Sequence, residues 1–244
     1  MMDMDYKRSE WNGFERLDFI FEGHPAILVL PKTPVESNKW MLKTEYFNAF
    51  PSFEVEMVRN GYYLAYVESE TRWHGATDDD TKDRFCAFLE KEFSLNSKCL
   101  PVGMSCGGMQ AVYFAAKYPQ RVAALYLDAP VLNLLSCPVG LGMATDDLFD
   151  DFFKHTGITK SELINFRNHP IDNLEPILEN RIPVYLVCGD SDDVVPYEEN
   201  GKVLYERFIE KGADISLILK PGCGHHPHGL EDNTPLLDFA ARVY

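Results

Sequence analysis

Apolar and polar positions alternate along this chain in runs of two kinds, strand-like and helix-like. Residues 17–21 and 26–30 are rich in apolar side chains and flank Glu22-Gly23, a pattern that predicts an antiparallel hairpin. Three later runs are apolar almost throughout, as strands covered on both faces are: residues 62–67, 123–127 and 182–187. We expect these three runs to form the centre of a sheet.

Helical periodicity fills the intervals between the strand-like runs. Residues 79–93 and 197–211 each place apolar side chains at helical spacing. In the second run, the side chains expected to face the sheet are Val203, Leu204, Phe208 and Ile209. Residues 215–219 predict a last strand and residues 234–243 a closing helix. The alternation predicts an α/β fold, with a mostly parallel sheet, helices on both of its faces and the antiparallel hairpin at its N-terminal side.

The composition limits the kinds of binding partner and the cellular compartment that we expect. The 38 acidic residues outnumber the 23 basic ones and give a formal net charge of −15, which repels a polyphosphate backbone, so nucleic-acid binding is not expected. No run approaches the roughly 18 apolar residues of a membrane span, and residues 1–16 lack the apolar core of a signal peptide. The six cysteines show no paired spacing and are expected to be free thiols. We therefore expect a soluble, cytoplasmic protein without membrane partners.

Ser105 is the strongest indication of chemistry in the chain. It lies in Gly103-Met104-Ser105-Cys106-Gly107, between the apolar run 99–102 and the helix-like run 110–118. A strand that turns sharply into a helix strains the residue at the bend and exposes its side chain. Glycines are needed around it because Cβ atoms would collide. The segment predicts a nucleophile elbow with Ser105 as the nucleophile.

A carboxylate is expected after the strand-like run 182–187. Asp192 is the preferred acid and Asp193 the reserve, because an acid at the carboxyl end of a parallel strand can orient a histidine and stabilise its imidazolium form. The three aspartates within residues 188–196 are also typical of a turn that caps the helix after Pro196. Asp128, at the end of another predicted central strand, competes for the role of acid.

The histidine-rich segment 222–229 follows the last predicted strand. His225 is the preferred base and His226 the alternative register, because the preceding glycines let an imidazole reach both Ser105 and Asp192. The order Ser, Asp, His along the chain is the order found with a strand-turn-helix elbow. The sequence therefore predicts a complete Ser-Asp-His triad.

The same segment has two other interpretations. Its metal-binding residue types are Cys223, His225, His226 and His228. Adjacent histidines rarely converge on one ion, so we expect no metal, and no cofactor motif is apparent. The histidines could also merely cap and pack a loop, an interpretation that the matching positions of Ser105 and Asp192 argue against.

Four segments resemble a known superfamily: Trp40-Met41-Leu42-Lys43-Thr44-Glu45-Tyr46-Phe47, Asp128-Ala129-Pro130-Val131, Asn168-His169-Pro170-Ile171-Asp172 and, most distinctively, Gly224-His225-His226-Pro227-His228. Over about residues 17–239 the chain resembles α/β-hydrolases, and within them a branch of bacterial esterase-like serine hydrolases. The resemblance implies the same triad of Ser105, Asp192 and His225. It also implies one α/β-hydrolase domain over residues 1–244, with a small cap insertion at about residues 137–181.

Two backbone N–H groups are expected to form the oxyanion hole. Cys106, next after the nucleophile, supplies one, and Trp40 or Met41, in the loop after the run 26–30, supplies the other. Trp40 is equally interpretable as a core anchor. The candidate substrate-binding residues are His74, Asn200 and His226, which lie in expected substrate-facing loops or beside the base.

The expected function is hydrolysis of a carboxylic ester by a serine esterase, through an acyl-enzyme, on an acylated sugar or another small acyl compound. The expected partner is thus a small-molecule ester, and no cofactor is required. A peptidase or amidase of the same fold is the alternative among enzymes. A non-catalytic small-molecule binder that keeps the fold is the alternative outside them.

Overall fold

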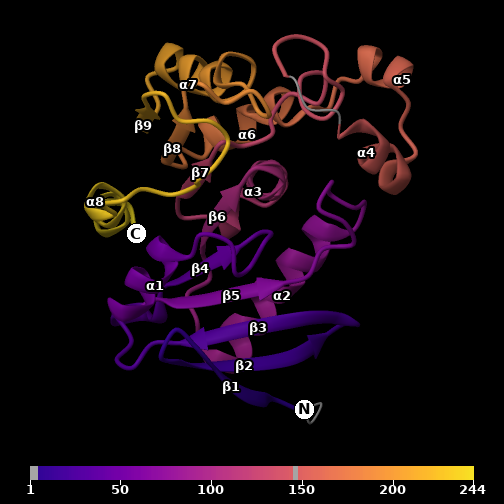
Figure 1. Ribbon diagram of the computed structural model, residues 1–244. Helices are drawn as coiled ribbons and strands as arrows, with labels where there is room; N and C mark the ends of the chain where they lie inside the picture. Colours follow the sequence, from indigo (N-terminus) through magenta and orange to yellow (C-terminus); the bar gives the residue numbers. More distant parts are fainter. Residues whose placement is uncertain (1–4, 145–147) are drawn as a thin grey trace.

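The computed structural model describes residues 5–144 and 148–244, and Figure 1 shows their arrangement. The strands are β1 (Lys7–Trp11), β2 (Phe14–Phe21), β3 (His24–Leu30), β4 (Trp40–Lys43), β5 (Tyr63–Val67), β6 (Leu100–Met104), β7 (Leu125–Asp128), β8 (Val184–Gly189) and β9 (Ile215–Lys220). The helices are α1 (Ser52–Arg59), α2 (Asp78–Phe93), α3 (Cys106–Lys117), α4 (Phe149–Thr156), α5 (Lys160–Asn165), α6 (Glu175–Glu179), α7 (Gly201–Glu210) and α8 (Thr234–Val243).

The strands within the described residues form one nine-stranded sheet in the order β1-β2-β3-β5-β4-β6-β7-β8-β9. Pairing is antiparallel from β1 through β3 to β5, and parallel from β5 to β9. The predicted hairpin and the predicted mostly parallel sheet are both confirmed. The three apolar runs expected at the centre became β5, β7 and β8, each of which has a strand on either side.

Helices cover both faces of the sheet, as predicted (Figure 1). One face carries α2, α3, α6 and α7, whose buried side chains join a single cluster that includes Phe85, Phe114, Ile177 and Phe208. The other face carries α1 and α8, which contribute Phe53 and Phe239 to a second cluster. Burial of these apolar side chains, at about 1.5–3 kcal/mol each for the larger ones, favours both layers.

The buried face of α7 is narrower than the sequence pattern predicted. Leu204 and Phe208 are buried, but Val203 is 38% exposed and Ile209 is 54% exposed. The helix begins only at Gly201, and the i,i+4 pair Leu204 and Phe208 defines its inward stripe. Val203 and Ile209 precede or follow this pair by one residue, a rotation of about 100° that turns them toward solvent.

The segment between β7 and β8 begins at the carboxyl end of β7 and contains α4, α5 and α6. Its residues Phe152 and Leu163 pack with Trp73 and Met109 in a third hydrophobic cluster. This segment is the one expected to form the cap, residues 137–181. Residues 145–147 of that range, and residues 1–4 of the chain, lie outside the described residues.

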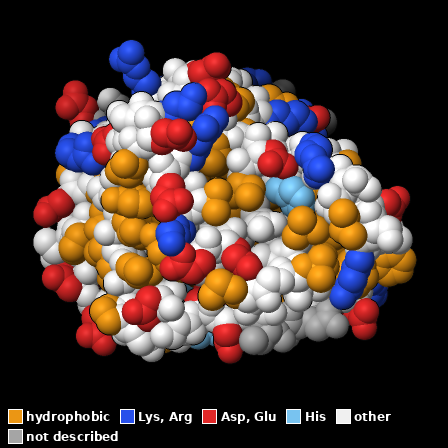
Figure 2. All heavy atoms as spheres, turned by 90° about the horizontal axis from the view of Figure 1, so that it is seen from above, with side chains coloured by type: hydrophobic (Ala, Val, Ile, Leu, Met, Phe, Trp, Pro, Cys, Tyr) orange, Lys and Arg blue, Asp and Glu red, His pale blue; other side chains and the backbone are white. Residues whose placement is uncertain are grey.

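On the face seen from above in Figure 2, acidic and basic side chains lie among hydrophobic areas rather than in separate fields. None of the helices formed by the described residues combines the length and the hydrophobicity that crossing a membrane requires.

Candidate active site

Ser105 lies at the sharp turn from β6 into α3. Its backbone angles are φ 52° and ψ −120°, a conformation that residues other than glycine rarely adopt. Other atoms approach the backbone closely at this turn and leave no room for a Cβ atom at two of its glycines. A Cβ at Gly103 would lie 2.5 Å from the carbonyl oxygen of Gly107, and one at Gly108 would lie 2.4 Å from Cβ of Pro130. The segment has the geometry of a nucleophile elbow.

His225 lies between Ser105 and Asp192. Its Nε2 is 3.0 Å from Oγ of Ser105, and its Nδ1 is 2.8 Å from Oδ2 of Asp192. The three residues follow β6, β9 and β8, so segments distant in sequence meet at the carboxyl edge of the parallel strands. The structure therefore brings the three predicted residues together, with His225 in place rather than its alternative His226.

The carboxylate of Asp192 is fixed by its own turn. Its Oδ1 accepts hydrogen bonds from the backbone N–H groups of Val194 and Val195, at 3.0 and 2.8 Å. The side chain is 1% exposed, whereas residue Asp193 is exposed. These bonds hold one carboxylate oxygen toward the backbone and leave the other facing His225.

Asp128, the competing acid, binds a different histidine. Its Oδ1 is 2.6 Å from Nδ1 of His228, and its Oδ2 accepts a hydrogen bond from the N–H of Gly229 at 2.7 Å. The hydroxyl of Tyr126 lies 3.2 Å from Oδ2. This buried pair joins β7 to the segment after β9, beside the triad.

A cavity of about 440 Å³ opens over Ser105. Its lining includes Tyr46, Phe50, Arg72, Cys106, Leu148, Val194, His225, His226 and His228. The Tyr46 hydroxyl lies close to the side chains of Cys106 and Arg72. Burial raises the pKa of the Tyr46 hydroxyl well above its usual value and that of the Cys106 thiol to about 11, so both groups stay protonated at neutral pH.

The expected second oxyanion donors do not lie in this cavity. Trp40 and Met41 belong to β4, a short central strand. The N–H of Trp40 donates to the Tyr244 hydroxyl at 3.2 Å, and Met41 pairs with residues of both neighbouring strands. Trp40 is fully buried and acts as a core anchor. The loop at the carboxyl end of β4, rather than β4 itself, reaches the cavity, through Tyr46.

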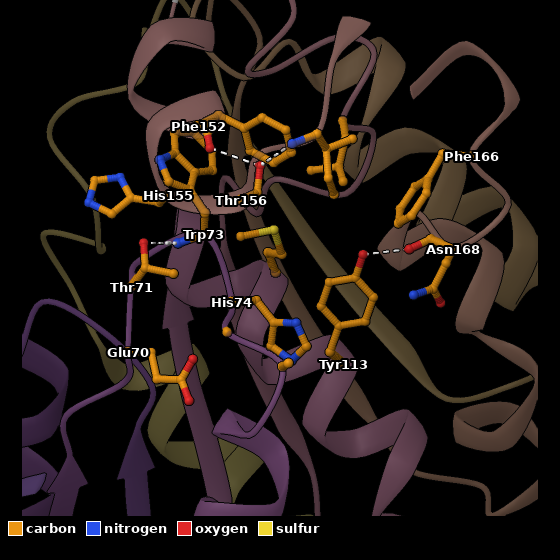
Figure 3. A pocket seen from close by; sticks show the side chains of 15 residues that line it. Glu70, Thr71, Trp73, His74, Tyr113, Phe152, His155, Thr156, Phe166 and Asn168 are labelled. Atoms are coloured by element: carbon orange, nitrogen blue, oxygen red, sulfur yellow. Dashed lines mark hydrogen bonds between the residues drawn. The ribbon is translucent and has the colours of Figure 1, made fainter. Parts of the chain in front are cut away.

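His74 lies at a separate cavity of about 530 Å³ (Figure 3). Its ring stacks on that of Tyr113 with the centroids 4.4 Å apart, and its Nε2 is 2.9 Å from Asp79. Phe152 and Phe166 line the same cavity. His74 is thus placed in a pocket, but not in the one that contains Ser105.

Asn200 is a structural residue rather than one that faces substrate. It is 1% exposed. Its Oδ1 accepts hydrogen bonds from the N–H groups of Leu132 and Asn133, both at 2.9 Å, and its Nδ2 donates to the carbonyl of Pro196 at 3.0 Å. These bonds tie the chain after β7 to the start of α7. His226, in contrast, is exposed and lines the Ser105 cavity, with its ring stacked on Phe50.

Several cavity residues carry no prediction from the sequence, among them Tyr46, Phe50 and Arg72. Tyr46 and Phe50 follow β4, and Arg72 follows β5. Loops at the carboxyl ends of parallel strands line the sites of open α/β sheets. This rule indicates Arg72 from the predicted strand 62–67, but it indicates Tyr46 and Phe50 only where β4 is recognised as a strand.

Several solved structures are similar to this fold. A puromycin hydrolase matches with a TM-score of 0.66 at 18% identity, over 92% of this chain and 36% of that one. Dipeptidyl peptidase 4 of Porphyromonas gingivalis matches with 0.62 at 14% identity, over 98% of this chain and 34% of that one. An acylaminoacyl peptidase of Pyrococcus horikoshii matches with 0.62 at 14% identity, over 91% and 37%. This chain spans about a third of the length of these proteins.

At such low identities the solved structures establish the fold alone. The sequence comparison goes further, because residues 66–244 match the family model described as the prolyl oligopeptidase family. That match covers well over half of the chain. The protein is therefore an α/β-hydrolase, and it belongs to the prolyl oligopeptidase family of serine hydrolases.

Proposed function

We propose that this protein hydrolyses small carboxylic esters through an acyl-enzyme on Ser105. The observation that supports this most is the pair of distances that link Ser105 through His225 to Asp192, 3.0 Å and 2.8 Å. A serine hydroxyl alone is a weak nucleophile. An adjacent base that is oriented by a third group activates it.

In the proposed reaction, Nε2 of His225 accepts the Ser105 proton as Oγ attacks the carbonyl carbon of the ester. The tetrahedral intermediate collapses, the same nitrogen returns the proton to the departing alkoxide, and the alcohol leaves. Water then repeats the sequence on the acyl-enzyme and releases the carboxylic acid. Asp192 stabilises the imidazolium that forms in each half of the cycle.

We assign the oxyanion hole to the backbone N–H of Cys106 and the hydroxyl of Tyr46. Cys106 is the first residue of α3, where an N–H has no acceptor within the helix. Tyr46 lines the same cavity as Ser105, and the raised pKa of its hydroxyl keeps the donor proton in place. Backbone N–H groups and tyrosine hydroxyls both serve as oxyanion donors in enzymes.

The size and chemistry of the cavity favour a small, neutral acyl compound. About 440 Å³ lies within the range of small-molecule sites. Phe50, Leu148 and Val194 supply apolar lining. The guanidinium of Arg72 is paired with the carboxylate of Asp151 at 2.6 Å, so its charge is balanced and does not require an anionic substrate.

Cleavage of amide bonds is the second candidate, and family membership favours it. The similar structures include a puromycin hydrolase and an acylaminoacyl peptidase. The triad can cleave an ester or an amide, because His225 can protonate a departing amine as well as an alkoxide. The two candidates differ in the leaving group that the cavity admits.

A matched pair of substrates separates them. The nitrophenyl ester and the nitroanilide of one short acyl group present the same acyl chain with different leaving atoms. We expect wild-type protein to hydrolyse the ester, with little turnover of the anilide, and Ser105→Ala to hydrolyse neither. Preferential hydrolysis of the anilide would replace the ester proposal with amide cleavage. Folded protein that turns over neither substrate would favour a non-catalytic binder.

A further inference from the structure

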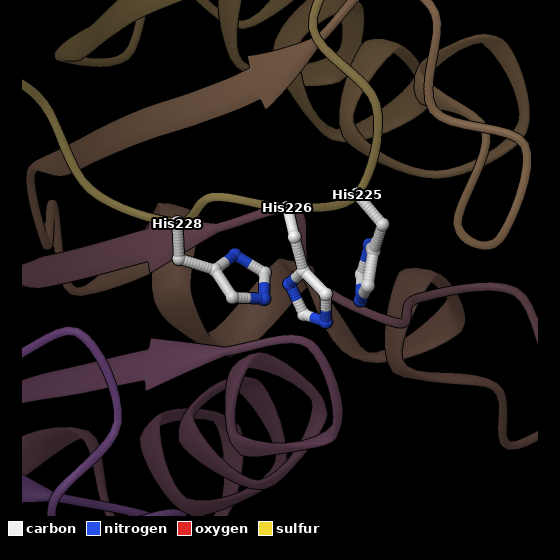
Figure 4. Close-up of side chains that lie close together, drawn as sticks. All are labelled: His225, His226 and His228. Atoms are coloured by element: carbon white, nitrogen blue, oxygen red, sulfur yellow. The ribbon is translucent and has the colours of Figure 1, made fainter.

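The Ser105 cavity contains a group of three histidines that the triad uses only in part. One ring nitrogen from each of His225, His226 and His228 lies within 4.8 Å of the others. The ring centroids are 4.8–4.9 Å apart, and Figure 4 shows the rings side by side on the segment after β9, with nitrogen atoms turned toward neighbouring rings. Three imidazole rings from one short segment of the chain therefore lie close together beside Ser105.

Two of the three rings are already oriented as metal ligands usually are. In His225 and His228, Nδ1 lies 2.8 Å from Asp192 and 2.6 Å from Asp128. A carboxylate at Nδ1 makes that nitrogen the N–H donor and leaves a lone pair on Nε2. The same carboxylate–histidine arrangement fixes the tautomer of histidines that bind zinc and raises their basicity.

His226 is the ring that can complete the group. It is exposed, and its ring stacks on the partly exposed ring of Phe50 with centroids 5.6 Å apart. Zinc binds imidazole nitrogens at about 2.0–2.1 Å, so three nitrogens on a tetrahedral ion lie about 3.3 Å apart. The three nitrogens lie within 4.8 Å of one another, so an ion requires them to move closer, and the exposed His226 is the ring with most room to rotate.

We propose that His225, His226 and His228 form a Zn²⁺ site in the Ser105 cavity, and that bound Zn²⁺ inhibits the enzyme reversibly. Three neutral imidazoles suit zinc and other borderline transition metals, and poorly suit Mg²⁺ or Ca²⁺, which prefer oxygen ligands. The lone pair of His225 Nε2 that would accept the Ser105 proton is donated to the ion instead. The fourth coordination position is then open to water.

The inhibitory effect rests on the function proposed above, but binding of the ion does not. Binding is therefore measured separately, by calorimetric titration of metal-free protein with ZnCl₂ and by the visible absorption of bound Co²⁺. We expect one ion per chain. His226→Ala should weaken Zn²⁺ binding by about tenfold or more, and Asp128→Asn by about 10- to 100-fold, the usual cost of losing a carboxylate behind a ligating histidine.

His24→Ala is the matched control for the binding experiment. It removes an imidazole from β3, where the ring contacts the carbonyl of Glu68 rather than the cavity. It should bind Zn²⁺ as the wild type does. The proposed site is wrong if wild-type protein shows no saturable binding of Zn²⁺, or if His226→Ala and His24→Ala bind it equally well.

Inhibition is measured as the rate at which a fluorophosphonate labels Ser105, with EDTA or with saturating ZnCl₂. We expect Zn²⁺ to slow labelling of the wild type by about tenfold or more and excess EDTA to restore it, with a much smaller change in His226→Ala. Zn²⁺ that binds without slowing the labelling would overturn the inhibitory role. A protein that is unlabelled even in EDTA would instead contradict the proposed hydrolase function, while the calorimetry would still decide the metal site.

Discussion

His225–Asp192 and His228–Asp128 are two histidine–aspartate pairs at one edge of the sheet, and they differ in what surrounds the rest of each ring. In both pairs Nδ1 lies against a buried carboxylate, at 2.8 Å and 2.6 Å. Nε2 of His225 faces Ser105 Oγ at 3.0 Å, whereas the ring of His228 packs edge-on against Phe50. A carboxylate partner therefore does not by itself make a histidine a base. A nucleophile within reach of the second nitrogen does.

The two carboxylates also have different second partners. Asp192 is held by the N–H groups of Val194 and Val195, in its own turn. Asp128 accepts a hydrogen bond from the N–H of Gly229, so it contacts the segment after β9 at two points. We interpret the His228–Asp128 pair as a clamp that positions this segment, and the His225–Asp192 pair as the catalytic one.

The largest effect should come from His225→Ala. We expect kcat to fall by about a millionfold, since loss of one member of a catalytic triad can cost nearly as much as loss of all three. His226→Ala removes the adjacent imidazole, whose ring stacks on Phe50, and should cost far less. Ester hydrolysis by folded variants, verified by circular dichroism, measures both. Equal losses would contradict the assignment of the base.

Asp192→Asn should produce the next largest effect. An amide N–H in place of the carboxylate favours the wrong tautomer of His225, and the change should lower kcat by about ten-thousandfold with the fold intact. Asp128→Asn makes the same substitution in the other pair and should reduce kcat much less. Steady-state kinetics of the two variants, measured side by side, test which pair is catalytic. A lower kcat for Asp128→Asn than for Asp192→Asn would contradict the assignment.

Tyr46→Phe should lower kcat by about a hundredfold to a thousandfold, the usual cost of one oxyanion donor. The aromatic ring stays in place, so the loss reports on the hydroxyl. Tyr113→Phe is the matched control, because its hydroxyl donates to the carbonyl of Asn168 in the neighbouring cavity. A kcat for Tyr46→Phe that equals that of Tyr113→Phe would remove Tyr46 from the oxyanion hole.

The smallest expected effect is a change in the free energy of unfolding. Asp128→Asn disturbs buried hydrogen bonds to His228 and Gly229, and we expect it to lower the free energy of unfolding by about 1–3 kcal/mol. Urea titration at neutral pH measures this. Asp238→Asn, at an exposed position on α8, should leave the free energy of unfolding nearly unchanged. Equal stabilities for the two variants would contradict the clamp.

The sequence predicted the placement of the triad because its determinants are local. Ser105 is marked by the glycines that a tight turn needs, and Asp192 and His225 follow strands that are apolar enough to be recognised. The carboxyl ends of parallel strands meet at one edge, so the three segments had to converge. The same reasoning predicted the sheet and its helical layers.

Features that depend on tertiary contacts could not be predicted in this way. β4 is only four residues long and ends in Lys43, which is buried with Glu54, so its pattern does not indicate a strand. Trp40 and Met41 were consequently expected in a loop. The sequence around Asn200 predicts a loop that faces substrate, whereas the residue is buried by its hydrogen bonds to the chain after β7. The gathering of the three histidines likewise follows from how their segment folds back on β7.

The assignment of His225–Asp192, and not His228–Asp128, as the catalytic pair is tested most directly by the rate at which a fluorophosphonate labels purified protein. The modified peptide is mapped by mass spectrometry. Wild type, Asp192→Asn and Asp128→Asn are compared in EDTA, with Ser105→Ala as the blank. We expect stoichiometric labelling at Ser105 in the wild type, strongly slowed labelling in Asp192→Asn and nearly normal labelling in Asp128→Asn. Labelling that depends on Asp128 and not on Asp192 would contradict the assignment of His225–Asp192 as the catalytic pair.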